Sequence, residues 1–145
     1  MTKIYSQGIC KGNGMARNRG GWSYVILNPD GSVIKNSGMI QNVTNHQICL
    51  IAAIESLKNI GNHRDVELYT NSTMIFDCFK NNWIESWEEN NWKTRSNKLV
   101  ANKELWIELS ELVKSQNVTL YKSKELVDDN YIGMTRRLSE EVLIG

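Results

Sequence analysis

The sequence predicts an α/β fold in which helices cover both faces of a five-stranded mixed sheet. Three observations support this prediction. Three strand-like segments open the chain, a helical segment and a fourth strand follow, and further helices precede a fifth strand and a closing helix. An antiparallel start followed by alternating helices and strands is typical of a mixed sheet packed between layers of helices.

The first three strands are predicted from short apolar segments and the turns between them. Residues 3–6 form the first strand, and the glycine-rich residues 8–21 are expected to be a loop. Residues 22–27 and 33–40 form a hairpin around Asn28-Pro29-Asp30-Gly31. The proline of this turn presets its own φ angle and the glycine accepts a positive φ, which favours a tight connection.

The first helix and the fourth strand have clear local signals. Thr44 followed by Gln47 is a capping-box pattern, so a helix is expected to begin at about Asn45. Residues 65–70 alternate as a strand, and Asn71-Ser72 is expected to cap the next helix.

The C-terminal half is predicted from its apolar spacing. After Asn81-Asn82 the helix is expected to break and resume, and a polar loop over residues 90–97 precedes another helix. That helix directs Leu105, Leu109, Leu112 and Val113 inward. Residues 118–121 are expected to form the last strand, and a short helix begins near Thr135.

Composition limits the classes of function. The 145 residues, 41% hydrophobic and 23% charged, predict a single domain spanning residues 1–145. A net charge of +1 gives no whole-molecule attraction to phosphate, so nucleic-acid binding would need a local patch. Without an apolar signal stretch or membrane-length run, we expect an intracellular protein, cytoplasmic or nuclear, with no membrane partner. Three cysteines outside any Cys-x-x-Cys motif favour reduced thiols.

Several segments together resemble a known family. They are Ile4-Tyr5-Ser6-Gln7-Gly8, Thr44-Asn45-His46-Gln47-Ile48-Cys49, Leu68-Tyr69-Thr70-Asn71-Ser72, the stretch through Asn130 and Met134, and Asn82 to Thr94 with Trp83, Trp87 and Trp92. The order and spacing of these segments are similar to type 1 ribonuclease H. The resemblance covers nearly the whole chain and implies a ribonuclease H-like fold. Residues 82–94 resemble the family's substrate-binding handle.

The resemblance also implies four metal-binding carboxylates, and none is present. The matching positions are Gln7, Cys49, Asn71 and Met134. The family cleaves the RNA strand of an RNA–DNA hybrid with two Mg²⁺ ions held by those carboxylates. Mg²⁺ prefers anionic oxygen ligands, whereas this chain offers two neutral amides and two sulfur atoms. We therefore expect no metal, no cofactor and no enzymatic activity, with Mg²⁺ binding lost.

Other positions that the family uses to hold the hybrid carry suitable residues. The candidate nucleic-acid-binding residues are Cys10, Asn13, Thr44, Asn45, His46, Trp83, Trp87, Trp92, Lys93, Thr94 and Asn102. Amide and hydroxyl groups suit contacts to phosphates and 2′-hydroxyl groups in a minor groove. Each of these residues also has a structural interpretation, because Thr44 and Asn45 start a helix and tryptophans at helical spacing often pack in a core.

Charge gives arguments in both directions. Glu85, Glu88 and Glu89 make the handle acidic, which opposes binding to phosphates. Lys122, Lys124 and Arg136 could supply basic charge elsewhere, although a charge cluster is commonly just a solvated face.

Three functions follow from these observations. The leading hypothesis is a catalytically inactive ribonuclease H-like protein that binds RNA–DNA hybrid or duplex nucleic acid. The alternative is a structural or protein-interaction module, for example in a viral or reverse-transcribing assembly, with a protein partner or a second copy of itself. The third is weak residual ribonuclease H activity from a site rebuilt near Asp128 and Asp129. Cys10 and Cys49 are expected to be two reduced thiols, since a zinc site normally requires four ligands.

Overall fold

The computed structural model describes residues 1–12, 18–125 and 130–144. Its sheet contains β1 (Thr2–Lys11), β2 (Arg19–Leu27), β3 (Val33–Gln41), β4 (Asp65–Thr70) and β5 (Asn117–Lys122). The strand order is β3-β2-β1-β4-β5. β1, β2 and β3 are antiparallel neighbours, whereas β4 runs parallel to both β1 and β5. The predicted five-stranded mixed sheet is confirmed.

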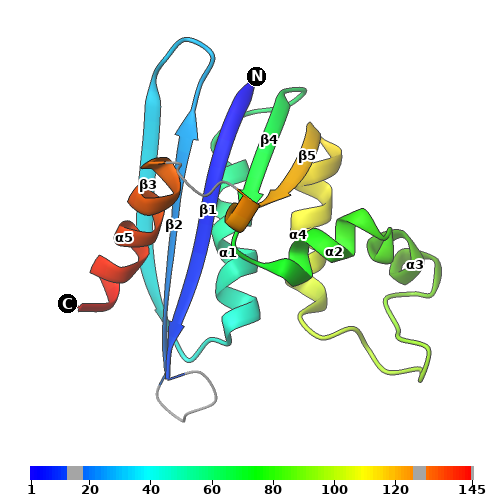
Figure 1. Ribbon diagram of the computed structural model, residues 1–145. Helices are drawn as coiled ribbons and strands as arrows, with labels where there is room; N and C mark the ends of the chain where they lie inside the picture. The colour runs from blue at the N-terminus through cyan, green and yellow to red at the C-terminus, as the bar shows by residue number, and fades with distance from the viewer. Residues whose placement is uncertain (13–17, 126–129, 145) are drawn as a thin grey trace.

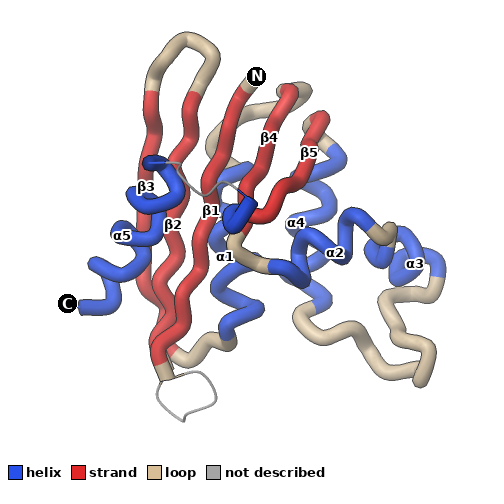
Figure 2. Tube along the Cα trace, in the orientation of Figure 1, coloured by secondary structure: helices blue, strands red, loops and turns tan. Residues whose placement is uncertain are grey.

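Helices cover both faces of this sheet (Figure 1). They are α1 (Asn45–Leu57), α2 (Thr73–Lys80), α3 (Trp83–Glu89), α4 (Lys103–Lys114) and α5 (Asn130–Ile144), with a short 3-10 turn, η1 (Ser123–Glu125). α1 packs on β1 and β2 and against α4, while α5 packs on the opposite face of β1 and β2. Figure 2 shows the long loop that joins α3 to α4 at one end of the molecule, far from α5.

Each face of the sheet has its own hydrophobic cluster. Ile4, Ile48 and Trp106 belong to the larger cluster, on the face covered by α1 and α4. Tyr5 and Val25 belong to the smaller one, beneath α5. Ile4 and Tyr5 are consecutive on β1 and enter different clusters because successive strand side chains point to opposite faces. β1 is therefore buried on both sides.

The glycine-rich segment differs from its prediction. We expected a loop over residues 8–21, but β1 continues to Lys11 and β2 begins at Arg19. The glycines in this segment allow helices to approach the strands closely. A Cβ atom on Gly8 would lie 2.6 Å from the Cys49 backbone nitrogen of α1, and one on Gly21 would lie 2.4 Å from the Ser139 carbonyl oxygen of α5. At Gly8 and Gly21, glycine is therefore required by close packing rather than by a turn.

Local signals elsewhere were confirmed. The Thr44 hydroxyl accepts a hydrogen bond from the Gln47 backbone N–H, and the Gln47 side chain accepts one from the Thr44 N–H. The Ser72 hydroxyl accepts from the Ile75 N–H and caps α2. The hairpin turn places Gly31 at a φ of 89°. The closing helix is longer than expected, because it begins at Asn130 rather than near Thr135.

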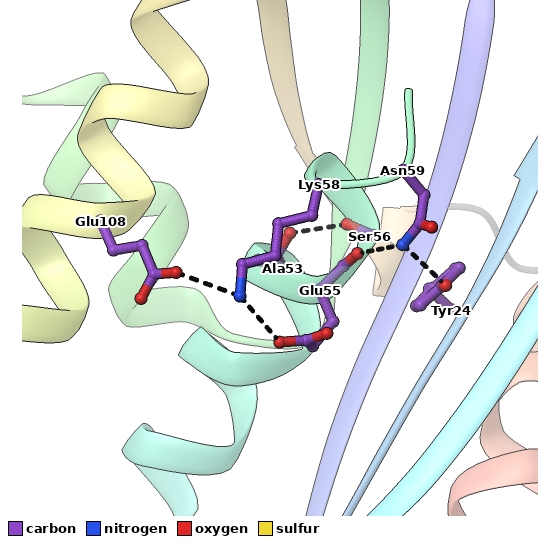
Figure 3. A network of polar contacts seen from close by, with 7 residues as sticks. All are labelled: Tyr24, Ala53, Glu55, Ser56, Lys58, Asn59 and Glu108. Atoms are coloured by element: carbon purple, nitrogen blue, oxygen red, sulfur yellow. Dashed lines mark hydrogen bonds and ion pairs between the residues drawn. The ribbon is translucent and has the colours of Figure 1, made fainter. Parts of the chain in front are cut away.

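Polar contacts at the end of α1 connect it to two other elements (Figure 3). The Lys58 ammonium lies 3.3 Å from Glu55 and 3.2 Å from Glu108 of α4. The Asn59 side chain donates to the Tyr24 hydroxyl of β2 at 3.0 Å. Exposed ion pairs contribute little to stability, so these contacts mainly fix the position of α1 against α4 and the sheet.

In the part of the chain that the structure describes, none of the helices has the length and apolar character needed to span a membrane.

Candidate nucleic-acid interface

Gln7 and Asn71 lie together beside the end of β4. Gln7 is buried within β1, and Asn71 follows directly after the last residue of β4. Both line the same pocket, which is described below. The parallel pairing of β1 with β4 ends at Ser6 and Thr70. Gln7 and Asn71 are the residues that follow this last pair.

The Asn71 amide makes two hydrogen bonds to the backbone of one residue, Gly8. Its Nδ2 donates to the Gly8 carbonyl oxygen at 2.8 Å, and its Oδ1 accepts from the Gly8 N–H at 3.2 Å. The side chain thus continues the pairing of β4 with β1 one residue beyond the strand. An amide side chain can donate to the carbonyl and accept from the N–H at the same time, whereas an ionised carboxylate could only accept.

Cys49 contacts the same group of atoms from α1. Cys49 is 4% exposed, and its single S–H lies within hydrogen-bond distance of two acceptors, the Gly8 carbonyl oxygen at 3.6 Å and Asn71 Oδ1 at 3.7 Å. Burial raises the pKa of the Cys49 thiol to about 11, which outweighs the opposite effect of the hydrogen bond to Gly8. The thiol is therefore neutral near pH 7.

Met134 is separated from the other three positions. It packs with Tyr5, Val25 and Tyr69 in the cluster beneath α5 and does not line the pocket. The structure thus brings Gln7, Cys49 and Asn71 together and leaves Met134 in the apolar layer.

These four side chains do not fit Mg²⁺. They present two neutral amides, of which that of Asn71 is bonded to the backbone, a neutral thiol and a thioether, whereas Mg²⁺ prefers anionic oxygens. Across the described residues, no three His, Cys, Asp or Glu side chains group in a way that could hold a metal ion.

Basic residues surround the pocket next to Gln7 and Asn71. The pocket has a volume of about 260 Å³ and is lined by Gln7, Thr70, Asn71, Thr73, Lys122, Ser123, Lys124, Ile132 and Arg136. The sequence indicated that Lys122, Lys124 and Arg136 were basic, but not that β5, η1 and α5 bring them to one place. Ser123 had no sequence signal at all.

A second group of polar candidates gathers where α1 and α4 begin. Thr44, Asn45 and His46 are exposed at the start of α1. The Gln47 side chain donates from Nε2 to Oδ1 of Asn102 at 3.0 Å and so connects this segment to the start of α4. Asn102 adopts a left-handed backbone conformation with a φ of 60°. Cys10 is half-buried nearby, and its thiol donates to the Val43 carbonyl oxygen.

The sequence predicted that Gln47 caps α1, but it did not predict that the same side chain connects α1 to Asn102 at the start of α4. The glutamine amide serves both purposes because its oxygen and nitrogen face different partners.

A third group forms a pocket on α3 and the loop after it. This pocket, of about 450 Å³, is lined by Trp83, Ser86, Trp87, Asn90, Lys93, Thr94 and Arg95. Trp83 is 40% exposed. Trp87 and Trp92 are partly buried against the core, with ring centroids 6.1 Å apart, and Trp87 also meets Trp106 edge-on at 5.6 Å. The handle therefore divides its tryptophans between one exposed ring and two packed ones.

The acidic residues of α3 do not line this pocket. Glu85 lines a different pocket beside α4, and Glu88 forms a 2.6 Å ion pair with Lys114 of α4. Residues 83, 86, 87 and 90 share one side of the helix because they are three or four residues apart. Glu85 and Glu88 are thus directed away from the aromatic and basic side of the segment.

Asn13, Asp128 and Asp129 lie outside the described residues, so the predictions about them stay predictions.

Comparisons with known proteins identify the family. The family described as RNase H matches residues 1–124. The chain belongs to the ribonuclease H family. "Ribonuclease H" of Thermoanaerobacter sp. (strain X514) is 36% identical over 141 residues, which are 97% of this chain and 88% of that protein. "Ribonuclease H" of Chlorobium luteolum is 34% identical over 97% of this chain and 93% of its own length.

Solved structures show the same fold. LC9-RNase H1, described as a type 1 RNase H with the type 2 active-site motif, gives a TM-score of 0.77 at 22% identity, covering 97% of this chain and 70% of that one. A foamy viral protease-reverse transcriptase in complex with RNA/DNA hybrid gives 0.81 at 14% identity, covering 97% of this chain and 20% of that one. The predicted ribonuclease H-like fold is confirmed.

The prediction that the chain is not an enzyme is wrong. Relatives that are 33% to 36% identical over 97% of the chain are named ribonuclease H, which is an enzyme. The prediction rested on the absence of carboxylates at Gln7, Cys49, Asn71 and Met134. The chemistry of a site depends on every group around it and not only on those four positions.

Proposed function

We propose that this ribonuclease H family protein binds RNA–DNA hybrid or double-stranded nucleic acid. The observation that carries the proposal is that the aromatic and acidic side chains of α3 lie on different sides of the helix. Trp83 shares a pocket with Lys93, Thr94 and Arg95, while Glu85 and Glu88 are directed toward α4. This arrangement supplies an aromatic ring and local positive charge on a protein whose net charge is only +1.

The polar group at the starts of α1 and α4 supports the same proposal. Thr44 and Asn45 are exposed, and the Gln47 amide holds Asn102 beside them. Hydroxyl and amide groups suit a minor groove because they can donate to phosphate oxygens and can both donate to and accept from 2′-hydroxyl groups. The foamy viral structure, which shares this fold, was determined with an RNA/DNA hybrid, and a second one was determined with double-stranded DNA.

We also propose that Gln7, Cys49, Asn71 and Met134 do not hold Mg²⁺. Their neutral donors support this, as does the basic pocket beside them, because positive side chains repel a dication.

Fluorescence anisotropy tests the binding proposal. Labelled RNA–DNA hybrid, double-stranded RNA and double-stranded DNA of one sequence are titrated with the protein over a salt series in EDTA. We expect measurable affinity at low salt for at least one duplex, decreasing steeply as salt rises. If none of the three duplexes binds at low salt, the proposal is refuted.

Cleavage of the RNA strand is a second candidate, favoured by the name that the relatives carry. A hybrid with labelled RNA, incubated with Mg²⁺ or Mn²⁺, tests it directly. Products that disappear in an Asp128→Asn, Asp129→Asn double variant support cleavage by this chain, and no products above a protein-free control oppose it.

A role as a protein-interaction module has less support than it had from the sequence. The acidic residues that favoured it lie apart from the basic and aromatic pocket. Size-exclusion chromatography with light scattering would test self-association.

A further inference from the structure

The pocket beside Gln7 and Asn71 has the charge of an anion site. Three cations from three elements line it, namely Lys122 at the end of β5, Lys124 in η1 and Arg136 in α5. No acidic residue is among its described lining residues, and none of the three cations takes part in a salt bridge with the described residues. Among the described residues these three positive charges have no carboxylate partner, and because like charges repel one another, an anion in this pocket would be stabilised.

Two of the three cations are carried by packed parts of the structure. The Lys122 ammonium lies 5.0 Å from the centroid of the Phe76 ring in α2. Arg136 is carried on a helix that is fixed to the sheet, since the buried Ser23 hydroxyl donates to the Thr135 carbonyl oxygen at 2.6 Å. These contacts limit the freedom of Lys122 and of the helix that carries Arg136, which lowers the entropic cost of binding.

A buried hydroxyl group in the pocket also lacks a partner. Ser123 is 5% exposed, and its Oγ makes no hydrogen bond within the described structure. An unsatisfied buried hydroxyl is unfavourable, and an oxyanion could accept its hydrogen bond. The unpartnered Ser123 hydroxyl indicates a ligand independently of the charges of Lys122 and Lys124, because it is a missing hydrogen bond and not a charge.

We propose that this pocket binds a phosphate group through Lys122, Ser123, Lys124 and Arg136, without a metal ion. A phosphate has several oxygens that can each accept from a lysine, an arginine or a hydroxyl group, and such charge-assisted hydrogen bonds are strong. A volume of about 260 Å³ suits one phosphate group better than a whole drug-sized ligand.

The preferred source of that phosphate is the backbone of a bound nucleic acid, and this part of the inference rests on the proposed function. The pocket adjoins Gln7 and Asn71, two of the positions where the family resemblance implies metal ligands. Basic side chains would then neutralise a backbone phosphate directly. Free phosphate or a phosphate monoester has the same chemistry and is the other possible source.

Inorganic phosphate tests the pocket by itself. ¹⁵N-labelled protein is titrated with sodium phosphate, and with sodium chloride at the same ionic strength, while backbone amide shifts are followed by NMR. We expect saturable shifts at residues around the pocket with phosphate only. Arg136→Gln and Lys124→Gln should each weaken the phosphate affinity about fivefold to tenfold.

Two further variants make this test specific. Arg137→Gln removes the same charge from the next residue of α5, which is exposed and does not line the pocket, and it should leave the affinity within about twofold. Ser123→Ala should weaken phosphate binding severalfold without destabilising the protein, since no hydrogen bond within the described structure is lost. No saturable shift, or the same loss in Arg137→Gln as in Arg136→Gln, would overturn the proposal.

The same variants, assayed with the RNA–DNA hybrid, separate the two sources. A backbone phosphate predicts that Arg136→Gln weakens hybrid binding and reduces the salt slope by about one unit relative to Arg137→Gln. If only phosphate binding is weakened, the pocket binds free phosphate and the nucleic-acid part of the inference fails. If wild-type protein binds phosphate but no duplex, the proposed function fails and the phosphate site stands.

Discussion

The side chain of Asn71 pairs with the backbone of Gly8 as a strand residue would, with one hydrogen bond donated at 2.8 Å and one accepted at 3.2 Å. This contact connects the end of β4 to β1 at the edge of the candidate site. A residue at a position that the family resemblance assigns to metal binding therefore has a structural role in this chain.

We expect Asn71→Ala to lower the free energy of unfolding by about 1 to 2 kcal/mol, because two hydrogen bonds are lost. Urea unfolding at pH 7 measures this. Asn36→Ala is a suitable control, since the Asn36 side chain is exposed and accepts only from the neighbouring Ser37 N–H. An equal decrease in the free energy of unfolding in the two variants would show that the pairing of Asn71 with Gly8 does not stabilise the protein.

The buried Cys49 thiol predicts a loss of stability at alkaline pH. Its pKa is raised by burial to about 11, above the ordinary value of 9.0, so the unfolded chain loses its proton first as the pH rises. This contribution is complete below pH 9 and is lost between about pH 9 and 11, amounting to about 2 to 3 kcal/mol.

Urea unfolding at pH 8 and pH 10.5 checks this, with Cys49→Ala expected to show a smaller decrease than the wild type. Cys78, whose pKa burial raises to about 12, contributes to the same slope in both proteins and so does not obscure the difference. An unchanged slope in Cys49→Ala contradicts the prediction.

Trp83 and Trp87 should respond differently to replacement by alanine. Trp83 is exposed in the α3 pocket, so Trp83→Ala should weaken duplex affinity by about 1 kcal/mol or more with little effect on stability. Trp87 contacts Trp92 and Trp106, so Trp87→Ala should lower the free energy of unfolding by about 2 kcal/mol or more.

Anisotropy and thermal unfolding on both variants distinguish these roles. Full duplex affinity in a folded Trp83→Ala protein would remove the exposed ring from the interface. Stability within about 0.5 kcal/mol of wild type in Trp87→Ala would show that its ring contacts are weak.

Mg²⁺ should leave the melting temperature of the protein unchanged relative to NaCl at the same ionic strength. The reason is that Gln7, Cys49 and Asn71 offer no anionic ligand, and a ligand that does not bind cannot stabilise. In a Gln7→Asp, Asn71→Asp double variant, Mg²⁺ should raise the melting temperature by about 2 °C or more if two carboxylates restore binding. A magnesium-dependent increase in the wild type, absent with NaCl, would contradict the proposal.

The fold could be predicted largely from local signals. The capping box of Thr44 and Gln47 placed α1, the Asn28-Pro29-Asp30-Gly31 turn placed the hairpin, and the alternation of residues 65–70 placed β4. These signals are reliable because they depend on interactions between residues a few positions apart. The extension of β1 to Lys11 could not be predicted, because Gly8 is required by the approach of α1 and not by a turn.

The candidate site could be predicted only in part. The family resemblance indicated Gln7, Cys49 and Asn71, and the structure places them in contact or beside one pocket. The resemblance could not show that Met134 packs in the apolar cluster beneath α5, because a position in a sequence does not determine where its side chain is buried. The acidic residues of the handle suggested weak binding to phosphates. The sequence could not show that Glu85 and Glu88 lie on the side of α3 away from Trp83, because that depends on how the helix packs.

By itself the sequence determined the family, the order of helices and strands, and the absence of carboxylates at four positions, because these depend on residue identity and on spacing along the chain. The tertiary structure alone decided which charges meet. Lys122 and Lys124 are separated from Arg136 by more than ten residues, yet β5, η1 and α5 bring them around one pocket together with the unpartnered Ser123 hydroxyl. Electrostatic interaction depends on distance in space, and only the packing of α5 against the sheet sets that distance.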